Sequence, residues 1–290
     1  MTAIKARLAL ELYRYLVPML PSRVRMYLKR YIDANRAEWT QIGMLSVSLA
    51  DTPYQLLLDM RHWHQRWTYV KGHYPEPHIT HALDQYLDAG ALYIDIGANV
   101  GVHVVYGAHC VGASGHCIAF EPNPHSFERL NQQIQRNHLT QVTAHHTALG
   151  DQAGSIILHG CHDENVGSTL RPNTQQADDD CEVPLNRADM FLTDIPEEQV
   201  GLCKIDVEGF EFQVVQGLSH FLSRHPRMVY IVEVTDEWLR LSGASASQLF
   251  ALFQQHQFHA HYIDPHTAVT QPLTEPLPDQ QYDVLFKRID

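Results

Sequence analysis

The sequence predicts an α/β fold in which helices cover both faces of a mostly parallel β-sheet. The first indication is the unit over residues 91–124, where an apolar run, a turn with two glycines, a helical pattern and a second apolar run follow one another. The second indication is that largely apolar runs recur at 201–206 and 228–233, with a helical pattern between them. Short apolar runs bounded by Gly and Pro are typical of buried parallel strands, and their alternation with helices indicates βαβ units.

Composition indicates a folded protein with a sizeable core. The chain has 290 residues, of which 44% are apolar and 19% charged, in keeping with one large domain and a smaller attachment. No apolar run approaches the roughly 20 residues of a membrane span, and charges at Lys5, Arg7 and Arg14 argue against a signal peptide.

Cysteine and histidine usage argues against disulfides and metals. The five cysteines are odd in number and lack C-x-x-C spacing, so we expect neither a disulfide framework nor a zinc site. A reducing cytoplasm is the location that this favours. The 20 histidines form scattered pairs without a matching carboxylate motif, so no metal site is expected.

The N-terminal part differs in pattern from the rest. Residues 3–17 and 22–38 have helical spacing, residues 40–70 show no clear pattern, and the Pro-rich sequence at 74–77 marks a boundary. We therefore predict two parts, which are a helical extension over 1–72 and the main domain over 73–290.

Charge is distributed unevenly along the chain. The net charge is −12, but residues 1–36 contain eight Lys/Arg and two acids and so carry +6. The acidic remainder disfavours long nucleic acids as partners. Two interpretations of residues 1–36 stay open, namely packing on the main domain and contact with an anionic membrane surface.

The remaining elements follow from periodicity and from breaker residues. Gly90 ends a helical pattern that begins near Ile79, and Pro124 starts the helix after the second apolar run. The polar stretch 159–180 lacks periodicity and is expected to be a surface loop. The helices expected are 79–89, 125–138, 210–223 and 246–256, and the further strands are 142–144, 155–158, 258–263 and 282–287.

The turn after the first strand distinguishes two kinds of nucleotide ligand. A dinucleotide fingerprint requires Gly-x-Gly-x-x-Gly, but two of these glycines are replaced by Asn99 and Val102. Asp95 precedes the turn, where an acid suits an ammonium or sulfonium group better than a pyrophosphate. Glu121 ends the second strand, where its carboxylate can accept hydrogen bonds from two ribose hydroxyls. The pattern therefore favours S-adenosylmethionine as the cofactor.

Three motifs of the chain resemble the FkbM family of S-adenosylmethionine-dependent methyltransferases. They are the stretches 93–101, 120–124 and 204–211, and the last, Lys-Ile-Asp-Val-Glu-Gly-Phe-Glu, is the most distinctive. The resemblance covers residues 70–265 and implies the seven-stranded, Rossmann-like sheet of class I methyltransferases, with the last strand antiparallel. It also implies methyl transfer to a hydroxyl of a sugar, glycoconjugate or natural product.

The resemblance also assigns the cofactor site by position. The glycine turn would face the methionine part of the cofactor, and Glu121 its ribose. The family often has an acid or amide at the adenine position, whereas Leu149 stands near it here, so the adenine contact stays open. The cofactor-binding residues expected are Asp95, Gly97, Ala98, Asn99, Gly101, Glu121, Pro122, Asn123, Leu149 and Asp206.

Methyl transfer to a hydroxyl needs a group that accepts the hydroxyl proton. Asp206 and Glu233 end the fourth and fifth strands, which are neighbours of the first strand in a class I sheet, so both should converge with Asp95. Lys204 lies two residues before Asp206 and points to the same side of the sheet. Asp206, Lys204 and Glu233 are therefore the catalytic candidates. Lys204 and Asp206 either form an ion pair that holds the site together or position and deprotonate the acceptor, and Asp206 could instead bind the cofactor's amino group.

Three functional hypotheses remain at this point. They are an O-methyltransferase, a nicotinamide-dependent oxidoreductase on a similar sheet, and a catalytically silent nucleoside-binding protein that kept the fold. The missing third glycine counts against the oxidoreductase, and the intact acids Asp95, Glu121 and Asp206 count against the silent protein. A small molecule or glycan is the expected partner of the enzyme, and the sequence leaves the oligomeric state open.

Overall fold

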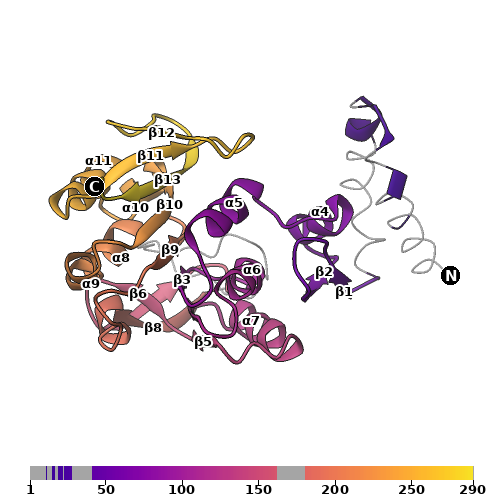
Figure 1. Ribbon diagram of the computed structural model, residues 1–290, viewed down its shortest axis with the longest axis horizontal. Helices are drawn as coiled ribbons and strands as arrows, with labels where there is room; N and C mark the ends of the chain where they lie inside the picture. Colours follow the sequence, from indigo (N-terminus) through magenta and orange to yellow (C-terminus); the bar gives the residue numbers. More distant parts are fainter. Residues whose placement is uncertain are drawn as a thin grey trace. The chain divides into compact units, whose positions relative to one another are not determined.

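A computed structural model describes residues 11, 15–16, 19–21, 23–27, 41–161 and 180–289. The chain divides into two compact units, Met1–Pro75 and Glu76–Asp290 (Figure 1). Residues 23–27 are helical, and most of the two helices predicted over 3–17 and 22–38 lies outside the described residues. Within the described part, no helix is both long and apolar enough to cross a membrane.

The first unit contains a hairpin that the sequence did not predict. Strands β1 (Met44–Ser48) and β2 (Gln55–Asp59) pair antiparallel, and helix α4 (Trp63–Lys71) follows. Leu56 and Leu58 are fully buried. The consecutive leucines at 56–58 obscure the alternation by which a half-buried strand is recognised. The predicted helical extension thus includes a small sheet as well.

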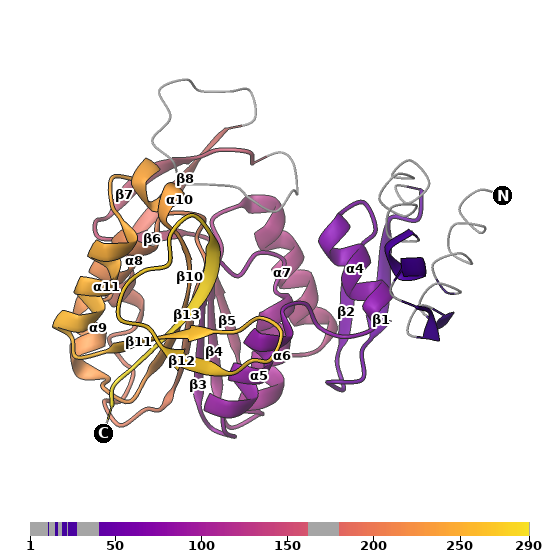
Figure 2. The ribbon, with the colours of Figure 1, turned by 90° about the horizontal axis from the view of Figure 1, so that it is seen from above.

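The second unit is built on an eight-stranded sheet (Figure 2). Its order is β12-β11-β13-β10-β9-β3-β4-β5, in which β13 runs antiparallel to both of its neighbours, as predicted for the last strand. Seven strands were expected, and the eighth is the short edge strand β12. The strands are β3 (Leu92–Ile96), β4 (His116–Phe120), β5 (Val142–His145), β9 (Gly201–Ile205), β10 (Val229–Thr235), β11 (His259–Ile263), β12 (Thr270–Pro272) and β13 (Gln281–Lys287).

Helices cover both faces of this sheet, as Figure 2 shows. Helices α5 (Pro77–Tyr86), α6 (Val102–Val111) and α7 (Pro124–Arg136) are placed on one face, and α8 (Glu211–Gly217), α9 (Ser219–Arg224) and α11 (Ala246–Gln255) on the other. Helix α10 (Asp236–Leu241) follows β10 directly. The helix predicted over 210–223 is interrupted at Leu218, which ends α8 and precedes α9. Before this break, a Cβ on Gly217 would lie 1.9 Å from the Gly150 carbonyl oxygen, so α8 packs backbone against backbone there.

A second, three-stranded sheet lies beside the main one. Its order is β6 (Ala148–Gly150), β8 (Cys181–Arg187) and β7 (Gly154–Leu158), and the short helix η2 (Ala188–Phe191) follows. The strand predicted over 155–158 therefore belongs to this sheet. Residues 162–179 lie outside the described residues, as does most of the surface loop predicted over 159–180.

Candidate active site

Two rows of charged side chains cross the carboxyl edge of the main sheet. In the first row Asp95 of β3 is the register partner of Lys204 of β9. The second row lies two residues further on, with Asp206 after β9 and Glu233 of β10 opposite Asp283 of β13. Residues two apart in a strand point to the same face. The structure thus brings Asp95, Lys204, Asp206 and Glu233 together, and it adds Asp283, which the sequence did not suggest.

Lys204 and Asp206 form a close ion pair. Lys204 Nζ lies 2.7 Å from Asp206 Oδ2, and Lys204 is only 5% exposed. Burial disfavours the charged lysine, but the carboxylates of Asp206 and Asp95 outweigh burial and raise its pKa. Burial also opposes ionisation of Asp206, and the ammonium of Lys204 outweighs it and lowers the pKa of this carboxyl. Asp206 is therefore a carboxylate and Lys204 an ammonium at neutral pH.

Glu233 is the protonated member of the group. Burial, followed by the negative charges of Asp206 and Asp283, raises the pKa of Glu233 to about 10. A hydrogen bond from Glu233 to Asp206 contributes to the lowered pKa of Asp206. Burial and the two neighbouring carboxylates thus favour the protonated form of Glu233, which donates this hydrogen bond to Asp206. Asp206 is the ionised carboxylate that remains to accept a proton.

Asp95 is buried at the end of the first strand with one oxygen unused. It is 1% exposed, and Tyr93 Oη donates a hydrogen bond to its Oδ2 at 3.0 Å. Its Oδ1 has no hydrogen-bond partner among the described residues. Burial raises the pKa of Asp95, and the positive charge of Lys204 partly offsets this. A buried acceptor without a donor is costly unless a ligand supplies the donor.

The glycine turn lies directly against the turn that carries Asp206. Gly97 has φ +87°, and a Cβ there would lie 1.8 Å from the Asp206 carbonyl oxygen. The Asp206 amide in turn donates to the Ile96 carbonyl at 2.9 Å. Asn99 also adopts positive φ, and a Cβ on Gly101 would approach Leu130 Cδ1 to 2.5 Å. Close backbone packing therefore fixes the glycine turn relative to Asp206.

Glu121 joins the glycine turn to the start of helix α7. Its Oε2 accepts the Asn99 amide and its Oε1 accepts the Asn123 amide, both at 2.7 Å. Burial raises the pKa of Glu121 to about 7, although these two amides favour the charged form. Asn123 caps α7 by accepting hydrogen bonds from the His125 and Ser126 amides. The Pro122 carbonyl lies 3.0 Å from His146 Nε2.

Comparison with models of protein families identifies the family of this chain. The model of the methyltransferase FkbM domain matches residues 95–260, more than half of the chain. The chain belongs to this family. Membership decides against the oxidoreductase hypothesis, and it agrees with the motifs on which the resemblance rested.

Two curated relatives resemble this FkbM-family chain over part of their length. Methyltransferase 1 of Beauveria bassiana (strain ARSEF 2860) is 28% identical over 144 residues, 43% of this chain and 57% of the relative. Hexuronic acid methyltransferase AglP of Haloferax volcanii is 27% identical over 135 residues, 44% of this chain and 50% of the relative. The chain thus spans about half the length of the curated relatives it matches.

Solved methyltransferase structures are also similar at low identity. Methyltransferase FkbM from Methylobacillus flagellatus KT has a TM-score of 0.43 at 12% identity, covering 76% of this chain and 52% of that chain. Fibrillarin from Aeropyrum pernix, crystallised with natively bound S-adenosyl-L-methionine, has a TM-score of 0.39 at 9% identity. The match covers 69% of this chain and 66% of the fibrillarin chain.

The residues of this FkbM-family site fit S-adenosylmethionine, the cofactor of such methyltransferases. The unused Oδ1 of Asp95 and the carboxylate of Asp206 suit the positive charges of a sulfonium and an ammonium group. Glu121 keeps lone pairs for hydroxyl donors because each of its oxygens can accept more than one hydrogen bond. Asp95 and Glu121 would hold the cofactor, with the turn at 97–101 beside them, and Asp206 lies next to that turn.

Leu149 is the predicted cofactor residue that stands apart from the others. It lies in β6 of the small sheet, and its side chain is 2% exposed within the main apolar core. His145, at the end of β5, stacks on Phe120 and lies close to Phe191. The structure therefore puts an imidazole at the end of the third strand, beside Glu121, whose amide donates to the His145 carbonyl.

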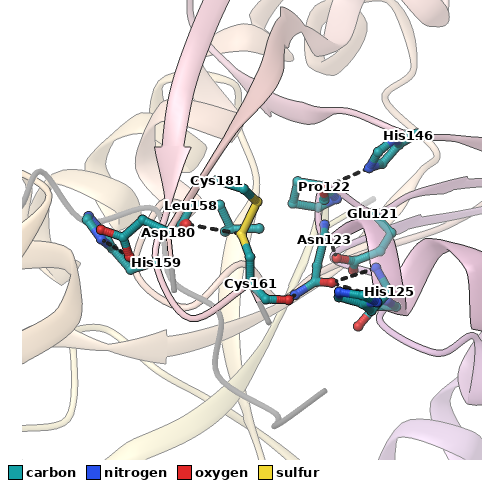
Figure 3. Close-up of a disulfide and its surroundings, with 11 residues drawn as sticks. Glu121, Pro122, Asn123, His125, His146, Leu158, His159, Cys161, Asp180 and Cys181 are labelled. Carbon is teal, nitrogen blue, oxygen red and sulfur yellow. Dashed lines mark hydrogen bonds and ion pairs between the residues drawn. A yellow bond between two sulfur atoms is a disulfide. The ribbon is translucent and has the colours of Figure 1, made fainter. Parts of the chain in front are cut away.

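The site has a disulfide at its rim, which corrects the sequence-based expectation (Figure 3). Cys161 and Cys181 are bonded across 20 residues. Asn123 Nδ2 donates to the Cys161 carbonyl at 3.4 Å, so the bridge adjoins the residue that caps α7. An odd number of cysteines does not exclude one bridge, and the three others are free. Cysteine usage therefore no longer favours a cytoplasmic location.

Proposed function

We propose that the chain transfers a methyl group from S-adenosylmethionine to a hydroxyl of a sugar, glycoconjugate or natural product, with Asp206 as the proton acceptor. One observation carries the proposal. Asp206 is an ionised carboxylate that Lys204 and Glu233 hold from two sides, directly against the glycine turn of the cofactor site. The acceptor must lie in line with a cofactor beside this turn, and its hydroxyl proton needs a base within reach.

Each neighbour of Asp206 has a separate task in this proposal. The bound cofactor supplies an electrophilic methyl group. Lys204 keeps Asp206 ionised, and Glu233 donates a hydrogen bond to one side of the Asp206 carboxylate. The remaining lone pairs of Asp206 take the proton of the acceptor hydroxyl as the O–CH3 bond forms, the bond from the methyl group to the sulfonium sulfur breaks and S-adenosylhomocysteine is left. Preorganised charges of this kind reduce the reorganisation that the reaction requires.

The relatives support the acceptor class. The name of the Haloferax volcanii relative states methylation of a hexuronic acid, which carries hydroxyl groups and a carboxyl group, so it supports a sugar as the acceptor. To test the proposal, the purified chain is incubated with methyl-labelled S-adenosylmethionine and a panel of glycosides, uronic acids, oligosaccharides and hydroxylated natural products. Transfer of label to a hydroxyl oxygen supports it. Transfer only to carboxyl oxygens or to nitrogen, sulfur or carbon acceptors would contradict it.

We also propose that the chain works in the cytoplasm and that its parts are residues 1–72 and 73–290.

We further propose that residues 1–36 contact an anionic membrane. The charge of +6 on residues 1–36 supports the contact, because each basic residue near an anionic surface adds about 1 kcal/mol. Vesicles with and without phosphatidylserine test it. Binding only to anionic vesicles, reversed by salt, is expected, and equal binding to both would contradict it.

A further inference from the structure

Helix α5 contributes a histidine to the charged rows at the carboxyl edge of the sheet. His78 lies in the first turn of α5 and is 7% exposed. Its Nε2 lies 2.7 Å from Asp283 Oδ2, although the two residues are 205 positions apart. Asp283 is the register partner of Glu233 across the antiparallel pair β10–β13. The pair His78–Asp283 is thus adjacent to the carboxyl that hydrogen-bonds to Asp206.

An ion pair lies on each side of Glu233. On one side is Asp206, paired with Lys204, and on the other is Asp283, paired with His78. Directly opposed residues of an antiparallel pair lie about 4.5–5.5 Å apart at Cβ, close enough for like charges to repel. Three acids in a row cannot all be ionised at low cost, so a proton must stay on one of them. Each outer acid forms an ion pair with a cation, whereas within the described ranges Glu233 forms none.

We propose that His78 and Asp283 are a positioning pair for methyl transfer: by holding an ionised carboxylate opposite Glu233, the pair keeps the proton on Glu233 and directs it to Asp206. The inference rests on the proposed role of Asp206, and its test requires no methyl acceptor.

The electrostatic surroundings act on each member of this row. Burial raises the pKa of Asp283, and the hydrogen bond and positive charge of His78 oppose this rise and favour its carboxylate. The negative charge of Asp283 is among the causes that raise the pKa of Glu233, after burial and Asp206. Burial opposes the charged form of His78, yet its hydrogen bond to Asp283 leads the effects that raise its pKa overall. Two effects act in the opposite direction on Glu233, namely a hydrogen bond with Gln281 and the positive charge of Lys204. The further charged groups lie around its neighbours. They are Glu76 and Asp264 near His78, and Asp95 and His103 near Lys204 and Asp206.

The test is a carboxyl titration by 13C NMR in the full chain labelled at the glutamate side-chain carboxyl, with Glu233→Gln assigning the resonance. Asp283→Asn removes the charge opposite Glu233 and keeps the side-chain size. We expect the apparent pKa of Glu233 to fall by about 1–3 pH units in this variant. In His78→Gln the carboxyl of Asp283 loses its cation and takes up a proton, so Glu233 loses the negative charge opposite it and should again titrate at lower pH. His81→Gln, an exposed histidine on the same helix, should leave the titration unchanged.

Several results would overturn the proposal. An identical Glu233 titration in the wild type and in Asp283→Asn would show that the pair does not act on Glu233. Loss of cooperative melting in both variants would show that the pair only stabilises the fold. If Glu233 responds to Asp283→Asn while the Asp206→Asn enzyme turns over as fast as the wild type, the proposed role of Asp206 is overturned and the effect of the pair on Glu233 stands. If Glu233 does not respond while the Asp206→Asn enzyme is inactive, this inference is overturned and the proposed function stands.

Discussion

The α-carbon of Gly97 and the carbonyl oxygen of Asp206 lie so close that a Cβ on Gly97 would be 1.8 Å from that oxygen. The first residue belongs to the turn that the family motif assigns to the cofactor, and the second carries the carboxylate proposed as the base. No side chain separates the two turns at this point. Their relative placement is therefore fixed by backbone atoms, which move less readily than flexible side chains.

Gly97→Ala should damage the site and the fold together. The new methyl group would overlap the Asp206 carbonyl, and Gly97 also has the positive φ that L-residues avoid. Overpacking of this kind costs about 1–3 kcal/mol or more. Gly243→Ala is the matched control, because Gly243 has the same φ of +87° but has open space where a Cβ would stand. Thermal melts and S-adenosylhomocysteine titrations should show a clearly larger loss for Gly97→Ala, and equal losses would contradict the packing argument.

Glu121→Ala should weaken S-adenosylhomocysteine binding by about 2–4 kcal/mol, because charge-assisted hydrogen bonds are lost. The structure adds a second effect, since Glu121 also receives the Asn99 and Asn123 amides and its loss should lower the melting temperature. Glu128→Ala, an exposed acid on α7, is the control. An unchanged dissociation constant in a folded Glu121→Ala protein would remove Glu121 from the ribose role.

Glu211 should make stability depend on pH. Its Oε1 accepts the Gly209 amide at 3.0 Å, and burial raises its pKa from 4.5 to about 7. The folded state therefore holds this proton more tightly than the unfolded state, so stability is full below pH 4.5 and falls as pH rises towards 7. The loss from this one group is up to about 3 kcal/mol. Glu211→Gln should reduce the dependence of the melting temperature on pH between about pH 4.5 and 7. Glu237→Gln, a control at an exposed residue, should leave that dependence unchanged.

Removal of the Cys161–Cys181 bridge should destabilise the second unit. Cross-links that close loops of this length contribute about 3 kcal/mol. Cys161→Ser should lower the melting temperature, and a reductant should lower that of the wild type by a similar amount. Cys110→Ser, at a free cysteine, is the control. A wild type whose melt does not respond to reductant, and whose thiols all react with a labelling reagent, would show that the bridge is not formed.

Local patterns predicted the parts of the fold in which strand and helix follow one another closely. The unit from Leu92 to Phe120 and the strand before Asp206 carry largely apolar runs, which the sheet buries on both faces. Contacts between distant segments left no such signal. His78 meets Asp283 across 205 residues, and Cys161 meets Cys181 without any spacing motif.

The convergence of the acidic side chains at one edge of the sheet could be predicted, because strand order fixes it. The protonation state of each acid could not be predicted. Register places Glu233 between Asp206 and Asp283, and only the structure shows that the latter has its own cation. The sequence therefore presented Glu233 as a catalytic candidate equal to Asp206. Its burial and its two acidic neighbours make it a proton donor to Asp206 instead.

The most direct test of the account is a comparison of Asp206→Asn with the wild type in cofactor affinity, stability and turnover. If Asp206 is the base, turnover on a hydroxyl acceptor should fall by about 10²–10⁴-fold, while the S-adenosylhomocysteine dissociation constant stays nearly unchanged. Asp194→Asn, an exposed aspartate, should behave as the wild type. If Asp206 only neutralises Lys204, the variant should lose stability, and adding Lys204→Met should restore it. An Asp206→Asn enzyme that turns over as fast as the wild type would contradict the central claim.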